Sequence, residues 1–597
     1  GSRLGYGWVK RLDNVRRAML VTQLATSARN FITGVGRVGV DVVDQGLQRG
    51  IELVTGRPQV ADPMGPLYAL MRLAQNNKAE VEEILSLFPD AKDRAFWTYQ
   101  SDLAAQMRAQ DVKPKNAADK ALLAAETAAH WANWHGRLQE FVVRRAVIAG
   151  EMDALLRRKG SSLSQAIREI QEMRPIVEQE IRAAAGGAPL TDDEVTRSVN
   201  ARIADRIGNL LTQQDMERVV DKALEMTFAE KPKFDSFGYH MVRMINKAPF
   251  VLTGVIPFPR FMWQASKFYL EFSPAGFIRS GAYGARPELL SRAIIGSLAY
   301  AVAFMLRDSD WAGEKWYEFQ LPDGRTLDIR PFNPFAFHFL IADAAKQYRD
   351  YMRGGVKPAI DMYSIIQAAA GVNLKAGLGL FALDKFIQGL RDMEDLSEAI
   401  PETAMKIPGE LLASFLVGLT TVNDMIGQFD EEHRVVRRKD MNPFLDPIIE
   451  KLPYAKTHLL ALHSPTREER LAREAPLLRQ LTGLTLGAVK NDAERELDRL
   501  HFTRQSILPG TGDKTADQLM AKHLGYWVET VLVPYVATPG YQKMPDLMKE
   551  MVLKKALTQL RKAAQGQFAT EDRERFLRLQ ASRRPSWQRI RIEEQEE

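Results

Sequence analysis

The sequence of 597 residues contains no cysteine, which excludes disulfide bonds, thiolate zinc sites and cysteine nucleophiles. Low-complexity tracts are absent as well. Charge of one sign is barely in excess, because 81 basic residues face 75 acidic residues and leave a net charge of +6. Such a balance argues against a dedicated nucleic-acid-binding protein, although a local basic patch could still contact phosphate.

The sequence also lacks a run of about 18 uncharged apolar residues, the length that marks a transmembrane helix. The best runs have 13 or 14 residues and are Ala293–Leu306, Met362–Leu374 and Leu411–Asn423. Such lengths fit buried core helices or interfacial segments better than membrane spans. We therefore expect core helices of a large assembly at these positions.

Catalytic and metal-binding patterns are missing too. The histidines His130 and His135 are five residues apart and do not share a helix face, and no HExxH pattern occurs. The glycine-rich stretch Gly34–Gly39 lacks the preceding strand and the Lys-Ser/Thr pair of a phosphate-binding loop. The sequence therefore predicts no enzyme, no cofactor and no metal site. One alternative stays open, because the single catalytic glutamate of a peptidoglycan hydrolase leaves little trace in a sequence.

Helical patterns fill most of the chain. From Asp62 to Phe228, Ala-rich and charged periodic runs contain few β-branched clusters, and Thr191–Glu194 forms a capping box after a break at Gly186–Pro189. A further helix should start at Pro545 and place on one face Met548, Val552, Ala556 and Leu560. We expect a mainly α fold, an elongated multi-domain helical assembly protein.

The first 60 residues combine narrow apolar stripes with arginines. Residues spaced by three or four form two such stripes, namely Trp8, Leu12, Val15 and Met19, then Phe31, Val35, Val38 and Val42. Gly34, Gly36 and Gly39 should weaken the helix in its middle. An amphipathic basic helix can lie on a membrane or pack on a partner, and packing within its own domain is the commoner outcome.

A proline- and aromatic-rich segment interrupts the helices between Lys231 and Pro274. Pro257–Phe261 cannot be a helix interior, because proline lacks the N–H donor and clashes with the preceding turn, so we expect a helix boundary there. The aromatic rings of the segment should be largely buried at an inter-domain or inter-subunit junction, because exposing so many is costly. These rings are Phe258, Phe261, Trp263, Phe268 and Tyr269.

One small β-hairpin is expected near 316–330. Trp316–Leu321 and Arg325–Arg330 alternate in character around Asp323-Gly324, a dipeptide typical of tight hairpin turns. Because an isolated hairpin is only marginally stable in water, its apolar face should be covered by helices or by a partner.

A chain of this length should form several domains. Composition divides it into five segments. They are amphipathic basic N-terminal helices at 1–60, a helical bundle at 61–230, the proline- and aromatic-rich junction with the hairpin at 231–340, a helical domain at 341–500, and a C-terminal helical domain with a basic tail at 501–597.

Two arginine-rich stretches are candidates for contact with DNA or anionic lipid. They comprise Arg16, Arg17, Arg29 and Arg37 at one end, and Arg573, Arg575, Arg583, Arg584, Arg589 and Arg591 at the other. The alternative is that these arginines pair with acidic residues of neighbouring helices.

Four pairs of stretches carry a family resemblance. They are Met19–Asn30 with Gly36–Asp41, Pro257–Phe261 with Glu271–Pro274, Leu321–Arg325 with Arg330–Pro334, and Ser464–Arg467 with Ala475–Gly483. Together they resemble modules of large polyvalent proteins of bacteriophages, including the internal virion (ejection) proteins of short-tailed phages. None of these stretches is catalytic.

The resemblance implies a virion structural protein that is released through the tail and helps to form a conduit for genome delivery across the host cell envelope. Other virion proteins and further copies of the chain are the partners it implies, with phage DNA and the host membrane as candidates. The protein would reside in the virion and, after ejection, in the host envelope and periplasm.

An alternative is a non-catalytic module of a giant phage polyvalent protein. Its enzymatic domain, an RNA polymerase or a lytic transglycosylase, would then lie outside this span. The start at Gly1-Ser2 without an initiator methionine motivates this alternative.

Overall fold

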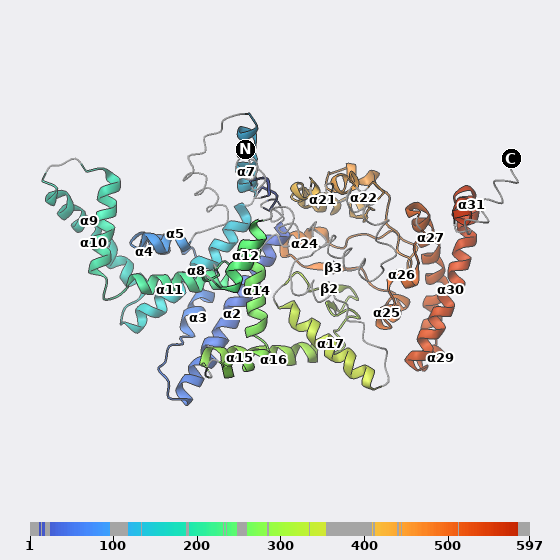
Figure 1. The fold of residues 1–597 in the computed structure, drawn as a ribbon, viewed down its shortest axis with the longest axis horizontal. Helices are drawn as coiled ribbons and strands as arrows, with labels where there is room; N and C mark the ends of the chain where they lie inside the picture. Colours follow the sequence, from blue (N-terminus) through green and yellow to red (C-terminus); the bar gives the residue numbers. More distant parts are fainter. Residues whose placement is uncertain are drawn as a thin grey trace. The chain divides into compact units, whose positions relative to one another are not determined.

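The computed structural model describes residues 11–95, 117–247, 259–353 and 409–582, apart from short gaps at 14, 18, 20–23, 133, 187–189, 231, 235, 283, 285, 333–334, 410–411, 439–440, 443 and 512. The described part is mainly helical with one small antiparallel sheet, so the mainly α class is confirmed (Figure 1). It forms two compact units. The first holds the described residues up to Ala301 with Phe332–Phe337, and the second holds Val302–Pro331 and the described residues from His338 onward. The finer division into five segments stays a prediction.

The helices of the first unit surround a large apolar core and a second, smaller apolar cluster around Phe268. They are α2 (Leu24–Val54), α3 (Met64–Arg72), α4 (Lys78–Ser86), α5 (Pro89–Ala95), α7 (Ala117–Ala132), α8 (Trp134–Arg158), α9 (Leu163–Ala184), α10 (Asp192–Arg206), α11 (Gln213–Met226), α12 (Phe237–Lys247), α14 (Pro259–Glu271), α15 (Ala275–Ala282) and the first part of α16 (Pro287–Arg307). Helix α8 is central, because α2, α3 and α11 all pack against it. A Cβ on its Gly150 would lie 2.5 Å from the amide nitrogen of Ala69 on α3, so only glycine permits this close approach.

Local signals placed several helix ends correctly. The side chain of Thr191 accepts from the amide of Glu194, and the Glu194 carboxylate accepts in return from the amide of Thr191, which confirms the capping box at the start of α10. Helix α9 ends at Ala184, and Gly186 follows with a left-handed φ of 59°. The predicted break between these two helices is therefore present.

Helix α2 differs from its prediction. It runs unbroken for 31 residues through the three glycines that were expected to weaken it. Its buried side is also largely polar, because Val38 is the one member of the expected apolar stripe that is fully buried. The other large buried side chains on this helix are Arg37, Asp41, Asp44 and Glu52. Glycine disfavours a helix only weakly, and the ion pairs that these charged side chains form with other helices outweigh that cost.

The aromatic segment forms a cluster inside the first unit. Helix α14 begins at Pro259, which confirms the predicted helix boundary, since proline is tolerated in a first turn. Phe268 and Tyr269 are buried as predicted, and Trp263 is partly buried beside Phe237. The position of Phe258 and the side chain of Phe261 lie outside the described residues.

The second unit contains the predicted hairpin. Strands β1 (Glu318–Gln320) and β2 (Thr326–Asp328) pair antiparallel around the Asp-Gly turn, with Phe319 opposite Leu327. The ring of Phe319 meets that of Phe339 edge-on, so a helix helps to cover this face. A third strand, β3 (Thr485–Gly487), pairs with β2, and it was not predicted.

The remaining helices lie in the chain after the hairpin. They are α17 (Ala336–Met352), α21 (Leu419–Gly427), α22 (Glu431–Arg434), α23 (Asp446–Ile449), α24 (Pro476–Thr482), α25 (Asp492–Arg499), α26 (Arg504–Ile507), α27 (Lys514–Trp527), α28 (Val533–Val536), α29 (Pro539–Gln542), α30 (Asp546–Glu571) and α31 (Arg573–Ser582), with a 3-10 turn at Ala455–His458 and a π-helical turn at Val528–Leu532. Helix α30 starts after Pro545 as predicted. Of the four residues expected on one face, Leu560 is buried, Val552 and Ala556 are partly buried and Met548 is exposed. The buried stripe of the helix is Leu553, Leu557, Leu560, Ala564 and Phe568. These larger apolar side chains pack with α27 in one core, so burial follows them.

Candidate functional site

Helix α16 departs most from the sequence expectation. Within the described residues it is the one helix long and apolar enough to cross a membrane by length and composition. It extends for 21 residues from Pro287 to Arg307, and only 28% of its most apolar window is buried. The stretch Ala293–Leu306 is therefore only in part a buried core helix, because its residues 298, 301, 302, 305 and 306 are exposed.

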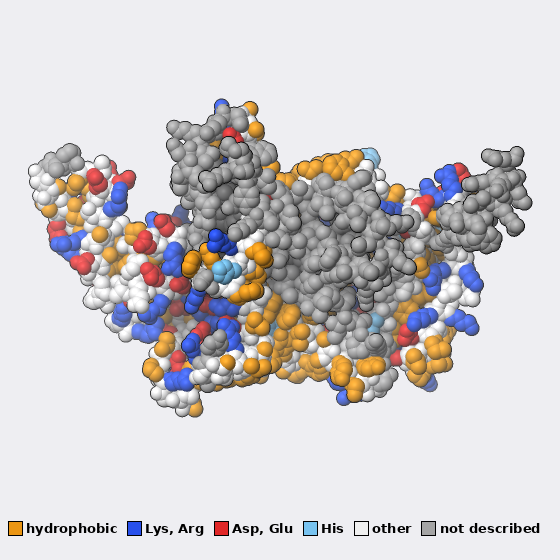
Figure 2. Space-filling view, in the orientation of Figure 1, with side chains coloured by type: hydrophobic (Ala, Val, Ile, Leu, Met, Phe, Trp, Pro, Cys, Tyr) orange, Lys and Arg blue, Asp and Glu red, His pale blue; other side chains and the backbone are white. Residues whose placement is uncertain are grey.

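The exposed residues of α16 lie on one side of the helix. Leu298, Val302 and Met305 are 59%, 54% and 70% exposed, and their spacing of four and three places them on one face. Figure 2 shows hydrophobic side chains gathered along the lower edge of the molecule, where Figure 1 places this helix. A contiguous exposed apolar face on a helix marks an interaction surface.

Arg292 lies on the buried side of α16 and binds it to other helices of the first unit. Its Nη1 donates to Glu271 at 2.6 Å, its Nε donates to Asp44 at 3.2 Å, and its Nη2 lies 3.2 Å from both Glu225 and Glu288. Burial alone would lower the pKa of Arg292, but the surrounding carboxylates outweigh it and raise that pKa well above the usual range. The guanidinium therefore stays charged at any physiological pH.

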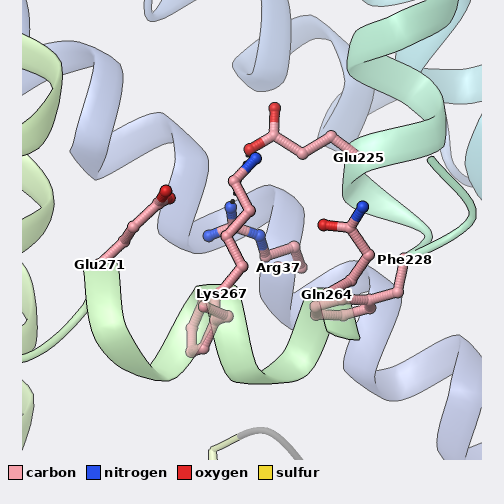
Figure 3. Close-up of a pocket in the computed structure, with 7 residues that line it drawn as sticks. Arg37, Glu225, Phe228, Gln264, Lys267 and Glu271 are labelled. Atoms are coloured by element: carbon pink, nitrogen blue, oxygen red, sulfur yellow. Dashed lines mark hydrogen bonds and ion pairs between the residues drawn. The ribbon is translucent and has the colours of Figure 1, made fainter. Parts of the chain in front are cut away.

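The charges of α2 and α11 extend this buried network. Lys222 donates to Asp41 at 2.7 Å. Nη2 of Arg37 lies 3.4 Å from Glu225, and both of these residues are drawn in Figure 3. Burial would raise the pKa of Glu225, but Arg292, Lys222 and Arg37 together hold it well below its usual value. Four helices, α2, α11, α14 and α16, thus meet around one ion-pair network.

A small pocket opens beside this network. It is partly open to solvent and is lined by Arg37, Glu225, Phe228, Gln264, Lys267, Phe268 and Glu271. Figure 3 shows Lys267 and Arg37 side by side, between the carboxylates of Glu271 and Glu225. Because Glu225 and Glu271 are already engaged by Arg292, and Arg37 lies over the Phe268 and Phe272 rings, the arrangement is that of a structural charge network.

Glu151 on α8 is a carboxylate of the first unit whose pKa is shifted towards neutral pH. Its pKa is raised to about 7, chiefly by burial and also by Asp41 and Asp62, while Lys222 and Arg158 oppose the shift. Its carboxylate lies against Gly65 on α3, where an added Cβ would come within 2.5 Å of Oε2. The close contact of α3 with α8 therefore encloses a titratable group.

One group of three carboxylates could in principle hold a metal ion among the described residues. It consists of Glu314, Glu318 and Asp498 in the second unit. The ammonium of Lys490 lies among them, 3.2 Å from Glu314 and 2.8 Å from Asp498, and it also contacts Glu318. The carboxylates raise the pKa of Lys490 although burial alone would lower it. A lysine cation therefore occupies the space that a metal ion would need.

Three of the arginines proposed for DNA or lipid contact are buried and paired. Arg16 donates to Asp13 at 2.8 Å, and Arg17 lies 3.1 Å from the other oxygen of the same carboxylate. Arg37 pairs with Glu225 as described above. At these three positions the arginines therefore pair with acidic residues, which was the alternative to contact with DNA or lipid.

The other proposed arginines have different surroundings. Arg573 is exposed, Arg29 is partly exposed, and Arg575 is partly exposed with its Nε 3.4 Å from Asp513. The remaining four lie outside the described residues, namely Arg583, Arg584, Arg589 and Arg591. Arg16, Arg17 and Arg37 belong to the first unit, and Arg573 and Arg575 belong to the second.

The stretch Ser464–Arg467, part of the family resemblance, has a structural role. The hydroxyl of Thr466 donates to Glu494 at 2.7 Å, and Arg467 binds the same carboxylate with two nitrogens. Glu494 also closes a capping box with Asn491 at the start of α25. This stretch therefore ties a turn to the start of a helix.

The sequence was compared with models of protein families, with curated proteins and with solved structures, and none of the three comparisons finds a match.

Proposed function

We propose that this chain is a structural protein of a short-tailed bacteriophage virion, an internal protein that after ejection helps to form a conduit for genome delivery across the host cell envelope. The resemblance of the four pairs of stretches supports the phage assignment. The proposal makes the protein a non-enzymatic component, whose partners are other virion proteins, further copies of itself, and the membrane that the genome must cross.

The single observation that carries the envelope role is the outward face of α16. A helix of this length and apolarity that leaves Leu298, Val302 and Met305 in water would be unfavourable on an isolated protein. Lipid removes exactly this kind of surface from water without requiring a shaped partner. The ion pairs of Arg292 fix the buried side of α16 to the protein, so that its apolar side remains exposed to solvent.

The arginine-rich C-terminal stretch is a second proposed contact. Arg573 is exposed, so it can reach a phosphate of DNA or of an anionic lipid. Arg16, Arg17 and Arg37 contribute little to such a contact, because their guanidinium groups already face carboxylates or amides inside the first unit.

Quantitative mass spectrometry of purified phage particles tests the proposal. We expect the chain in the particles at a fixed copy number, and in the membrane fraction of host cells shortly after infection. Finding it only in the cytosol of infected cells, and never in purified particles, would contradict the proposed function.

A further inference from the structure

Helices α15 and α16 form a compact pair with apolar side chains on the outside. A Cβ on Gly276 of α15 would lie 3.0 Å from Cβ of Ala293, and a Cβ on Gly296 of α16 would lie 2.1 Å from the carbonyl carbon of Phe272. These contacts show that the turn before α15 rests directly on α16. Despite this close packing, Phe277 and Ile278 of α15 remain 41% and 79% exposed.

We infer that α15 and α16 form a one-sided lipid-contact surface that lies in the plane of an anionic bilayer, with Phe277, Ile278 and Leu298 in the acyl boundary and Arg292 kept inside the protein. This inference rests on the proposed envelope role and specifies its contact surface. The apolar face continues along α16 to Val302 and Met305.

The two arginines of α16 favour contact by one face over a helix that spans the bilayer. Arg292 is bound by carboxylates from α2, α11 and α14, and Arg307 donates to Asp343 at 2.7 Å and to the carbonyl of Gly313 at 2.8 Å. A spanning orientation would surround both ends of the helix with lipid or headgroups and break these contacts. In-plane contact uses only the exposed face and leaves every ion pair intact.

Charge beside the surface points to anionic lipid. Arg286 is exposed just before α16, and Arg279 on α15 is exposed although its Nη1 donates to Glu271 at 3.2 Å. Arg57 donates to the carbonyl of Gly284 in the turn between these helices. An apolar face bordered by arginines is the pattern of a helix that lies at a membrane interface, where the acyl boundary takes the apolar residues and anionic headgroups take the cations. A second copy of the chain would instead present the same arginines to each other.

Vesicle flotation of the full chain tests the surface. The double variant I278E/L298E places two carboxylates in the proposed acyl boundary, and I176E is the matched control, because Ile176 on α9 is 55% exposed against 59% for Leu298. With vesicles of phosphatidylcholine and phosphatidylglycerol, we expect the double variant to lose binding by at least about tenfold. The I176E variant should bind within about twofold of the wild type, and circular dichroism should show all three proteins folded.

The orientation is tested by the depth of a single probe. The chain has no cysteine, so Leu298→Cys gives one labelling site for a fluorophore that lipid-attached nitroxides quench. We expect a depth of roughly 5–10 Å below the headgroups. A label near the bilayer centre would overturn the in-plane orientation.

Two further outcomes would overturn the inference. If I278E/L298E floats as well as the wild type, the lipid surface lies elsewhere while the virion assignment can still hold. If wild-type chain does not float but is a dimer that the same double variant dissociates, a second copy covers this face. Absence from purified particles would instead refute the proposed function, whatever the flotation result.

Discussion

Arg292 on α16 and Asp44 on α2 are 248 residues apart in the sequence, and Nε of the arginine lies 3.2 Å from a carboxylate oxygen of the aspartate inside the first unit. Ser291 donates to the other oxygen of Asp44 at 2.5 Å, so adjacent residues of α16 hold both oxygens. The same guanidinium reaches Glu271 and Glu225. One side chain therefore connects α16 to α2, α11 and α14.

Replacement of Arg292 by methionine should destabilise the chain strongly. Asp44 would remain buried without the guanidinium that pairs with it, and Glu271 would keep only Arg279, a loss that typically costs about 3–5 kcal/mol in the free energy of unfolding. The free energy of unfolding of R292K should lie between those of the wild type and R292M. Lysine keeps the positive charge, but its ammonium cannot bind three carboxylates with the geometry of a guanidinium. Urea denaturation followed by circular dichroism measures the change.

An exposed pair provides the control for this experiment. Arg182 pairs with Glu178 on the surface of α9, where both side chains are about half exposed. Replacement of Arg182 by methionine should change the free energy of unfolding by no more than about 0.5 kcal/mol. If R292M and R182M lose the same free energy of unfolding, the buried network stabilises the fold no more than an exposed ion pair does.

Glu151 should make stability depend on pH between about 5 and 7. Its pKa is about 7 in the folded chain against 4.5 ordinarily, so the folded state holds the proton more tightly than the unfolded state. This contribution is fully present below pH 4.5 and is lost as the pH rises through 7. The variant E151Q cannot ionise and should be more stable than the wild type above pH 7 by roughly 1–3 kcal/mol.

The measurement is the difference in unfolding free energy between E151Q and the wild type at several pH values. The other titrating groups are common to both proteins, so the difference isolates Glu151. A difference that does not change between pH 5 and pH 8 would contradict the raised pKa.

Gly296 and Gly39 should respond oppositely to alanine. A Cβ at Gly296 would meet the carbonyl carbon of Phe272 at 2.1 Å, so G296A should destabilise by about 1–3 kcal/mol or more. No atom lies within 4 Å of a Cβ at Gly39 inside α2, so G39A should stabilise by about 0.5–1 kcal/mol. Thermal unfolding of both variants measures these changes. If G296A raised the melting temperature, α16 could not pack directly against the turn at Phe272.

Lys490 should control whether the second unit responds to calcium. In the wild type its ammonium lies among Glu314, Glu318 and Asp498, so millimolar Ca²⁺ should leave the melting temperature unchanged. The variant K490M should lose roughly 2–4 kcal/mol, because three carboxylates lose their principal cation. Added Ca²⁺ should restore part of that loss, as calorimetry can show. A wild-type melting temperature that rises with Ca²⁺ would disprove this account of the cluster.

Features with local causes were predictable from the sequence. The capping box at Thr191, the start of α14 at Pro259 and the hairpin turn at Asp323-Gly324 each follow from a few adjacent residues, and the structure contains all three. Strand β3 was missed because Thr485–Gly487 is too short and too mixed in character to signal a strand before its partner is known.

Features that depend on distant partners were not predictable. The pattern of α2 suggested an apolar stripe, whereas its buried side carries Arg37, Asp41 and Asp44, which are stable there only because Glu225, Lys222 and Arg292 face them. Arg292 likewise made the apolar run of α16 look too short for a lipid-contacting helix. Its charge turns inward, so the outward face is apolar, and no spacing rule within the run reveals that direction.

The most direct test of the account is the quenching of a fluorophore at position 298 by nitroxides attached to lipid chains, measured on the full chain with anionic vesicles. We predict strong quenching and a blue shift for the label at Leu298→Cys, and neither effect for the same label at Ile176→Cys on α9, whose side chain is equally exposed in water. A label at position 298 that remains unquenched and unshifted at saturating vesicle concentration would contradict the claim that α16 meets the membrane.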